Sequence, residues 1–215
     1  MTSISQQDYL LAIYRLQEGE GLASTTALAR RLDIAPASVT GMVRKLQRKG
    51  LVEYQPYRGA LLTPAGERQA LQMLRRHRLW ELFLTQVLEL PWDKAHEEAH
   101  RLEHATSDRV AEQLAVFLGH PHVDPHGHRI PSSNGTFPLQ PRACMLEWEA
   151  GQTGTVAAIP DDDPAILRQL AAWGIVPGAQ LTVTGWDTAR DTVLVEVGNR
   201  KWTLGRDVAR QIRLG

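Results

Sequence analysis

The sequence predicts a multidomain α+β protein that consists of an N-terminal winged helix-turn-helix, an all-α middle domain and a C-terminal small β-barrel. Three observations support this fold class. Residues 24–63 show two short helical patterns and then a hairpin. Residues 64–118 show long helical patterns, one that runs towards Glu89 and one from about Trp92 to Leu118, and short strand patterns recur from Met145 onward. The 215 residues are enough for two or three small domains. The predicted domain boundaries are 1–74, 75–140 with a linker, and 145–215.

The helix-turn-helix is predicted from helix caps and apolar spacing. Ser24 can cap a short helix, and Pro36 suits the first turn of a second helix that stops at Gly50. Two strand patterns around the turn that contains Arg58 then form the wing. The second helix carries small and hydroxyl side chains and then a basic run, as in helices that contact base edges and phosphates. The candidate DNA-binding residues are Pro36, Ala37, Ser38, Thr40, Gly41, Arg44, Lys45 and Arg58, and Arg48 and Lys49 end the basic run.

Charge and cysteine content limit the function classes. The formal net charge is zero, yet residues 1–75 carry ten Lys/Arg against six Asp/Glu, and residues 76–118 carry five against eight. The basic surplus of the first part favours a DNA reader over an ordinary helical hairpin. Cys144 is the only cysteine, which excludes an intramolecular disulfide and zinc sites built on two or four thiolates. The polar N-terminus and the lack of a long apolar run predict a cytoplasmic protein that does not enter a membrane.

The histidines are concentrated in the middle of the chain. All eight lie between His77 and His128. His100, Glu103 and His104 share one face of a predicted helix, and imidazole together with carboxylate is a ligand set for a divalent transition metal. The alternative is that these side chains form the solvated face of a charged helix, but their linked spacing favours a metal site.

A second metal site is predicted from distance along the helix. His96 precedes His104 by eight residues, about 12 Å at a rise of about 1.5 Å per residue. Because ligand bonds are only about 2.0–2.2 Å long, one ion cannot join both imidazoles. His77 and Glu81 are an i, i+4 pair on the preceding helix, and they complete a second site with His96 if the two helices pack as neighbours.

Three further motifs leave alternatives open. The segment His96–His100 matches the H-E-x-x-H motif of zinc hydrolases, in which Glu97 would be the general base, so a zinc metallohydrolase is the alternative function. The segment Asp124–His128 is either a ligand group on the linker or a polar turn. The run Asp161–Asp163 is either a hard-cation site or a loop in which Asp163 caps the next helix.

Several stretches along the chain form a specific combination. They are Asp8-Tyr9-Leu10 with Ile13-Tyr14, Ser38–Val43, Gly50-Leu51, Leu62–Gly66, Arg76–Leu79, His96–His104, Pro125–Gly127 and Gly174–Gly178. This combination resembles the diphtheria-toxin-repressor family of metal-dependent regulators, and more closely its manganese-type members. The resemblance covers nearly the whole chain. It implies a winged helix-turn-helix, a helical dimerisation and metal-binding domain, and an SH3-like domain.

The resemblance also implies the metal ligands. The primary site falls on Asp8, His100, Glu103 and His104. Asp8 stands where iron-type members carry Met, and an oxygen ligand favours a harder ion such as Mn²⁺. His100 stands where Glu or Cys is usual in the family and adds a nitrogen ligand. The ancillary site takes His77, Glu81 and His96, or Glu81 with Asp124 and His126, and the SH3-like domain adds Asp161 or Asp163.

The implied function is a homodimeric regulator that binds a palindromic double-stranded DNA operator and represses metal-uptake genes when the ion is plentiful. Mn²⁺ is the expected ion and Fe²⁺ the next, Zn²⁺ or Co²⁺ can substitute in vitro, and two sites per subunit and no small-molecule substrate are expected. Asp8 lies on the first helix and the other primary ligands lie in the dimerisation domain, so bound metal favours one orientation of the two DNA readers. Two recognition helices then match successive major grooves, about 34 Å apart.

Overall fold

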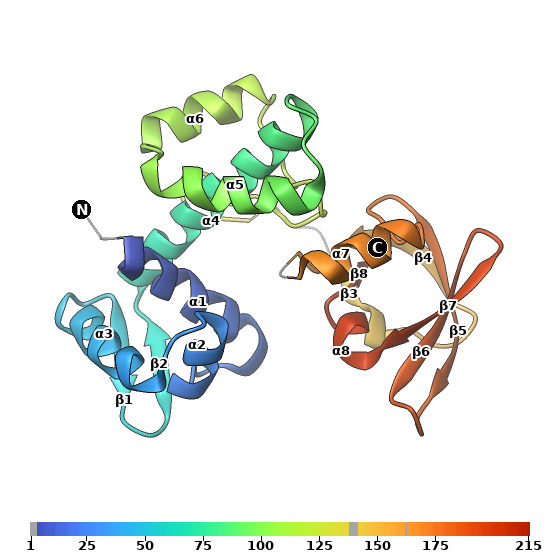
Figure 1. Cartoon of the computed structure of the whole chain (residues 1–215), viewed down its shortest axis with the longest axis horizontal. Coiled ribbons are helices and arrows are strands. Elements are labelled where there is room, and N and C mark those ends of the chain that lie inside the picture. Colours follow the sequence, from blue (N-terminus) through green and yellow to red (C-terminus); the bar gives the residue numbers. More distant parts are fainter. Residues whose placement is uncertain (1–3, 138–141, 162) are drawn as a thin grey trace. The chain divides into compact units, whose positions relative to one another are not determined.

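The computed structural model describes residues 4–137, 142–161 and 163–215 (Figure 1). Residue contacts divide the chain into two compact units. Unit 1 contains the chain up to His77 with Arg101–Gln113 and Pro131–Thr136, and unit 2 contains Arg78–His100, Leu114–Ile130 and Phe137–Gly215. The boundary passes through each of the three helices in the middle of the chain, so these helices belong partly to one unit and partly to the other.

The N-terminal elements form the winged helix-turn-helix that the sequence predicts (Figure 1). They are α1 (Ile4–Glu20), α2 (Thr25–Arg31), α3 (Pro36–Arg48), β1 (Val52–Gln55) and β2 (Gly59–Leu62). Ser24 Oγ accepts a hydrogen bond from Ala27 N at 3.1 Å and so caps α2, while Pro36 occupies the first turn of α3. Val39 and Val43 lie on the buried face of α3, in a core shared with the other helices and the hairpin. The opposite face of α3 is therefore left to solvent.

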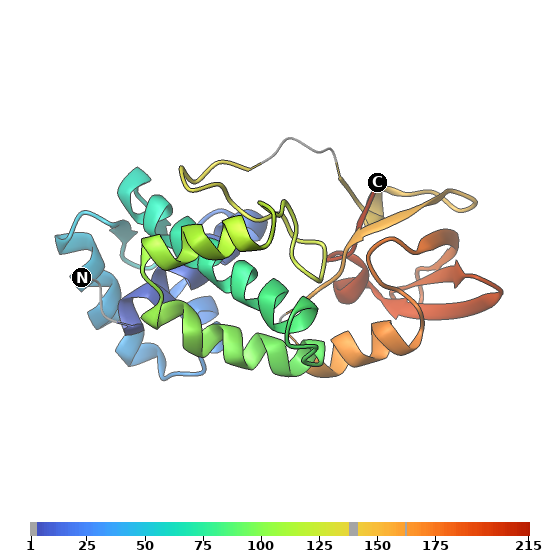
Figure 2. The same ribbon diagram turned by 90° about the horizontal axis from the view of Figure 1, so that it is seen from above.

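Three helices follow the wing (Figure 2). They are α4 (Pro64–Gln86), α5 (Trp92–Ala105) and α6 (Asp108–Phe117). The sequence predicts one helix from about Trp92 to Leu118, which is wrong because the chain breaks between α5 and α6. Thr106 Oγ1 donates to the carbonyl four residues before it at 2.7 Å, and Ser107 Oγ accepts from Val110 N at 3.3 Å and caps α6. No helix of the described residues is long and apolar enough to cross a membrane.

The C-terminal residues form a small antiparallel β-domain of the predicted SH3-like type (Figure 2). Its elements are β3 (Ala143–Cys144), the 3₁₀ turn η1 (Met145–Glu147), β4 (Thr153–Ala158), α7 (Pro164–Ala172), β5 (Gln180–Asp187), β6 (Thr192–Val197), β7 (Arg200–Gly205), α8 (Arg206–Ala209) and β8 (Arg213–Leu214). The strand order is β3-β8-β4-β5-β6-β7. Asp163 Oδ1 accepts from Ala165 N at 2.7 Å and caps α7. Of the two roles considered for Asp163, the structure therefore supports helix capping.

Candidate functional site

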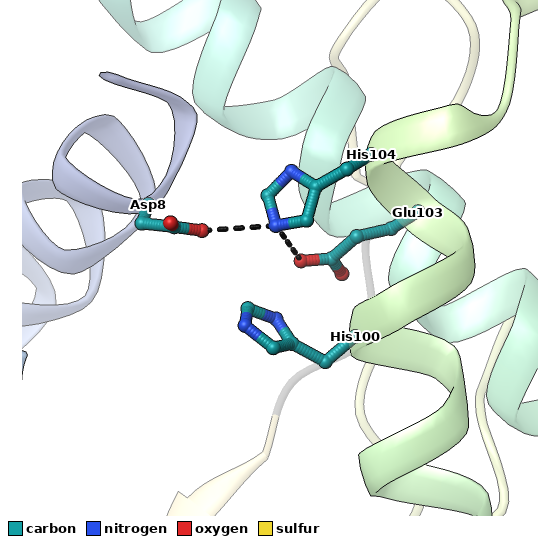
Figure 3. A group of neighbouring side chains, drawn as sticks. All are labelled: Asp8, His100, Glu103 and His104. Carbon is teal, nitrogen blue, oxygen red and sulfur yellow. Dashed lines mark ion pairs between the residues drawn. The ribbon is translucent and has the colours of Figure 1, made fainter. Parts of the chain in front are cut away.

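The first group of candidate metal ligands contains side chains of α1 and α5 (Figure 3). Asp8 comes from α1, and His100, Glu103 and His104 come from α5. Each offers one donor atom, and these atoms all lie within 4.8 Å of one another. His104 Nε2 lies 3.0 Å from Asp8 Oδ1 and 3.5 Å from Glu103 Oε1. The group therefore supplies two carboxylates and two imidazoles, and none of its four members offers sulfur.

Hydrogen bonds behind this group orient its donor atoms. Gln7 Oε1 lies 2.9 Å from His104 Nδ1, so in the neutral ring Nδ1 carries the proton and Nε2 carries the lone pair. Nε2 is also the atom that faces Asp8 and Glu103. On its other side, Glu103 Oε2 lies 2.6 Å from His77 Nδ1. Outer hydrogen bonds of this kind fix the ring orientation and basicity of ligands in metal sites.

A second group consists of His77 and Glu81 on α4 and His96 on α5. Their donor atoms also lie within 4.8 Å of one another. His96 Nδ1 lies 2.8 Å from Glu81 Oε1, and both His77 and Glu81 are buried. Because His77 directs Nδ1 to Glu103, its Nε2 remains as the ring atom suited to an ion in this group. One imidazole–carboxylate hydrogen bond therefore connects the first group with the second.

The same arrangement separates the two histidines of the H-E-x-x-H motif. His96 belongs to the second group and His100 to the first. The side chain of Glu97 is half exposed and lies 3.6 Å from Lys94. A zinc hydrolase needs both histidines on one ion with the glutamate beside it. The described geometry does not provide this, and the hydrolase alternative is unsupported.

A third group lies entirely within unit 2, in the linker and the SH3-like domain. It consists of Asp124, His126, His128 and Asp161, with donor atoms within 4.8 Å of one another. His126 is fully buried, and among the described residues neither of its ring nitrogens has a hydrogen-bond partner. A buried imidazole without partners is unfavourable unless a ligand satisfies it. From the sequence, His128 is part of the linker motif but is not among the expected ligands. The Pro125-His126-Gly127-His128 run is the sequence signal that could have identified His128 as a ligand.

The backbone of the linker holds the third group in shape. Asp124 Oδ1 accepts from His126 N and from His128 N, both at 2.9 Å, which closes a tight turn. Ile159 N donates to the His126 carbonyl at 3.0 Å. Gly127 has φ +86°, and a Cβ there would overlap the carbonyl of Ala157. Only glycine lets the linker approach the SH3-like domain this closely.

Opposing charges surround the third group. Burial lowers the pKa of His128, but the carboxylates of Asp161 and Asp124 outweigh burial and raise this pKa above its usual value of 6.5. His128 Nδ1 lies 3.4 Å from Asp161 Oδ2 and 3.5 Å from Asp124 Oδ2. Arg78 Nε lies 3.3 Å from the same Asp124 oxygen. Burial and then the nearby Arg129 lower the pKa of Arg142, which donates to the Gly127 carbonyl.

The structure thus distributes the ten ligands expected from the sequence over three groups. Glu81 lies with His77 and His96, whereas Asp124 and His126 lie with Asp161. The alternative ancillary set of Glu81 with Asp124 and His126 is therefore not brought together in any of the three groups. Asp163 belongs to none of the three groups.

The predicted DNA-binding residues lie on α3 and on the wing, which both belong to unit 1. Most of them are exposed, and Thr40 is half-buried. They are Pro36, Ala37, Ser38, Thr40, Gly41, Arg44, Lys45 and, on the wing, Arg58. A Cβ at Gly41 would meet no atom within 4 Å, so the backbone of α3 is open there. Lys49, at the end of the basic run, instead donates from Nζ to Gln6 Oε1 on α1 at 2.8 Å. This hydrogen bond connects the end of α3 with the helix that carries Asp8.

Comparisons with known proteins agree with this arrangement. The chain matches the N-terminal DNA-binding domain of iron dependent repressors over residues 1–60, their metal binding and dimerisation domain over residues 63–132, and the FeoA domain over residues 145–214. It is 30% identical over 219 residues to the iron-dependent repressor IdeR of Mycobacterium leprae, and the alignment covers 96% of this chain and 94% of that protein. It is 40% identical over 124 residues to the diphtheria toxin repressor of Corynebacterium glutamicum, and this alignment covers 57% of this chain and 54% of that protein.

Solved structures give the same result. A manganese-dependent transcriptional repressor in complex with manganese superposes with a TM-score of 0.90 at 38% identity, over 97% of this chain and 98% of that chain. The manganese regulator SloR superposes with a TM-score of 0.85 at 29% identity, over 98% and 97%. The chain belongs to the iron-dependent repressor family, whose members are metal-dependent DNA-binding transcriptional repressors and not enzymes.

Proposed function

We propose that this chain is a manganese-responsive repressor of metal-uptake genes, with Fe²⁺ as the next candidate ion. The donor chemistry of the first group carries the proposal. Asp8 and Glu103 supply oxygen, and His100 and His104 supply nitrogen. Hard carboxylate oxygen suits Mn²⁺, imidazole suits Fe²⁺ as well, and a sulfur-free set lacks the soft ligand that favours other metals. A structural neighbour described as bound to manganese and relatives described as iron-dependent are consistent with this pair of ions.

Selectivity between metals is expected to come from geometry and availability. Zn²⁺ and Co²⁺ bind most nitrogen and oxygen sites more tightly than Mn²⁺, so both should substitute in vitro. Two sites per subunit are expected from the sequence, and the second would be His77 with Glu81 and His96. The third group adds a further candidate site, because the partnerless ring of His126 fits a metal ligand. We propose that this site is structural and holds the linker on the SH3-like domain.

In the proposed mechanism, the ion controls DNA binding through α1. Asp8 is part of the helix that leads into the DNA-binding domain, whereas Glu103 and His104 belong to α5. An ion held by both helices favours the arrangement in which its ligands converge, and it shifts the population only by its preference for that arrangement. The Gln7–His104 and Gln6–Lys49 hydrogen bonds extend this contact through α1 to the end of α3.

We also propose a homodimer on a palindromic operator. Val110, Val116 and Phe117 of α6 are large apolar residues with exposed fractions of 47%, 51% and 66%. Such a patch on a short helix is typical of a protein–protein interface. A two-fold dimer would present two α3 helices to successive major grooves, which requires a two-fold symmetric DNA site. We propose that this dimer acts in the cytoplasm.

The test is DNA binding by the metal-stripped protein to its own upstream region, titrated with Mn²⁺, with Fe²⁺ under anaerobic conditions and with Zn²⁺. We expect tight binding only with metal, and loss of that response in Glu103→Ala/His104→Ala. The matched control is Glu97→Ala/His122→Ala, which removes the same two residue types from exposed positions outside the three groups. Equal binding with and without metal would overturn the proposal, and so would an equal loss in the control.

A further inference from the structure

The tip of the wing has a residue that its backbone geometry does not favour. Arg58 N donates to Gln55 O at 3.1 Å, which closes a β-turn with Pro56 and Tyr57 at its two central positions. Tyr57 has φ +66°. A turn with proline at the first central position and positive φ at the second is type II, and the second position is normally glycine or asparagine. A bulky side chain there is strained because its Cβ crowds the backbone.

Packing within the protein does not compensate for this strain. The side chain of Tyr57 has a relative exposure of 106%, so it is as open to solvent as in an extended peptide. A single exposed aromatic residue is ordinary on a protein surface. An aromatic residue that is fully exposed and also occupies a glycine position is not explained by folding. Strained positions of this kind are commonly retained for contacts with a partner molecule.

The base of the wing is fixed relative to the recognition helix α3. Ala23 and Ala60 exchange backbone hydrogen bonds of 3.0 and 2.9 Å, and a Cβ at Gly59 would lie 2.7 Å from the Ala23 carbonyl oxygen. Gln47 on α3 donates from Nε2 to the carbonyl of Tyr54 on β1 at 3.5 Å. All of these residues belong to unit 1. The hairpin that carries the wing tip is therefore anchored at its base to α3 and to the segment before α2.

We propose that Tyr57 is a DNA contact at the wing tip, where its hydroxyl donates to a backbone phosphate and its ring lies against the adjacent sugar. The exposed guanidinium of Arg58 follows directly, so the tip combines a cation with a phenol. Tyrosine hydroxyl and arginine are both common donors to DNA phosphates, and such contacts fix the register of the protein on the duplex. The proposal rests on DNA binding by this domain and not on the identity of the ion.

The test separates stability from binding. Tyr57→Gly and Tyr57→Asn relieve the strain, so we expect the melting temperature of the full-length, metal-saturated protein to stay the same or rise. DNA binding should nevertheless weaken by roughly tenfold, the value of one hydrogen bond to a charged group. The loss should be similar on the upstream region of the gene and on an unrelated duplex, because a phosphate contact does not depend on sequence. Tyr57→Phe should lose only part of the affinity.

Two controls define the contact further. Arg58→Gln should lower the salt dependence of binding by about one phosphate, whereas the Tyr57 variants should leave the salt slope unchanged. Asp191→Gly also relieves a positive φ, of +52°, but in the turn between β5 and β6, and it should not change DNA binding.

The proposal is overturned if Tyr57→Gly and Tyr57→Asn bind both duplexes within twofold of the wild type, or if they melt at a clearly lower temperature. A failure of the proposed manganese response has a different signature. In that case neither the wild type nor the variants bind DNA more tightly with metal, yet their affinities for the unrelated duplex still differ.

Discussion

Glu103→Gln separates the role of a buried carboxylate in the fold from its role as a metal ligand. Glu103 is fully buried, with Oε2 at 2.6 Å from His77 Nδ1 and Oε1 at 3.5 Å from His104 Nε2. Glutamine has the same size and keeps an oxygen that accepts from the His77 ring. We therefore expect the free energy of unfolding of the metal-free protein to change by less than about 1 kcal/mol.

The effect on metal binding should be much larger. Asp8 and Glu103 together balance the two charges of a divalent ion, and the variant leaves only Asp8. Loss of an outer partner of a metal ligand already weakens binding by about 10- to 100-fold, so loss of a direct carboxylate should reach about 100-fold. At an ion concentration 100 times the wild-type Kd, binding at this group stabilises the wild type by about 2.7 kcal/mol and the variant by about 0.4 kcal/mol.

The assay is a manganese titration followed by electron paramagnetic resonance of the free ion, together with urea denaturation followed by circular dichroism with and without Mn²⁺. Glu97→Gln is the matched control, because it makes the same substitution on the exposed side of the same helix. Because Glu103 also contacts His77, we expect a smaller loss at the second group. Wild-type manganese affinity in Glu103→Gln, or equal losses in both variants, would refute the ligand assignment.

Three further changes test the packing and the linker. In Gly66→Ala the new Cβ would overlap the carbonyl oxygen of Leu51, so we expect a destabilisation of about 1–3 kcal/mol in urea denaturation. Gly127→Ala would meet the carbonyl of Ala157 and should remove one bound Mn²⁺ or Zn²⁺ per chain in equilibrium dialysis without changing the metal response of DNA binding. In the metal-free protein, the raised pKa of His128 means that its ion pairs stabilise the fold below pH 6.5 and lose this contribution as pH rises through the folded-state pKa. Denaturation curves of His128→Gln on both sides of this pKa should lack that loss.

Local signals made most of the fold predictable from the sequence. The winged helix-turn-helix could be recognised because its signals depend on neighbouring residues only. These signals are the helix cap at Ser24, Pro36 in the first turn of α3 and the apolar spacing of α3. The break between α5 and α6 was missed because Thr106 and Ser107 fit a helix as well as a cap, and their side-chain hydrogen bonds decide the outcome. The two-residue strands β3 and β8 pair across some seventy residues of chain, which no short-range periodicity can reveal.

The metal groups show the same division between local and long-range signals. Helical spacing alone places His100, Glu103 and His104 on one face, and the structure brings their donor atoms together. Asp8 could be named only through the family resemblance, because the tertiary fold brings it to ligands far away in sequence. The Asp161–Asp163 run indicates a possible cation site by itself, but only the tertiary fold brings Asp161 to the histidines of the linker. His128 was missed as a ligand because its direction depends on a glycine turn rather than on a regular helix or strand.

The close approach of Gly127 to β4 has a consequence for how such a chain can evolve. The linker turn lies against β4 and the residue after it, where Ile159 N donates to the carbonyl of His126. A lineage that lost the C-terminal domain would lose the reason to keep a glycine at this position, and His128 would lose its ion pair with Asp161. The geometry therefore predicts that the turn and the C-terminal domain are kept or lost together. The groups on α4 and α5 do not depend on that unit and could persist unchanged in shorter relatives.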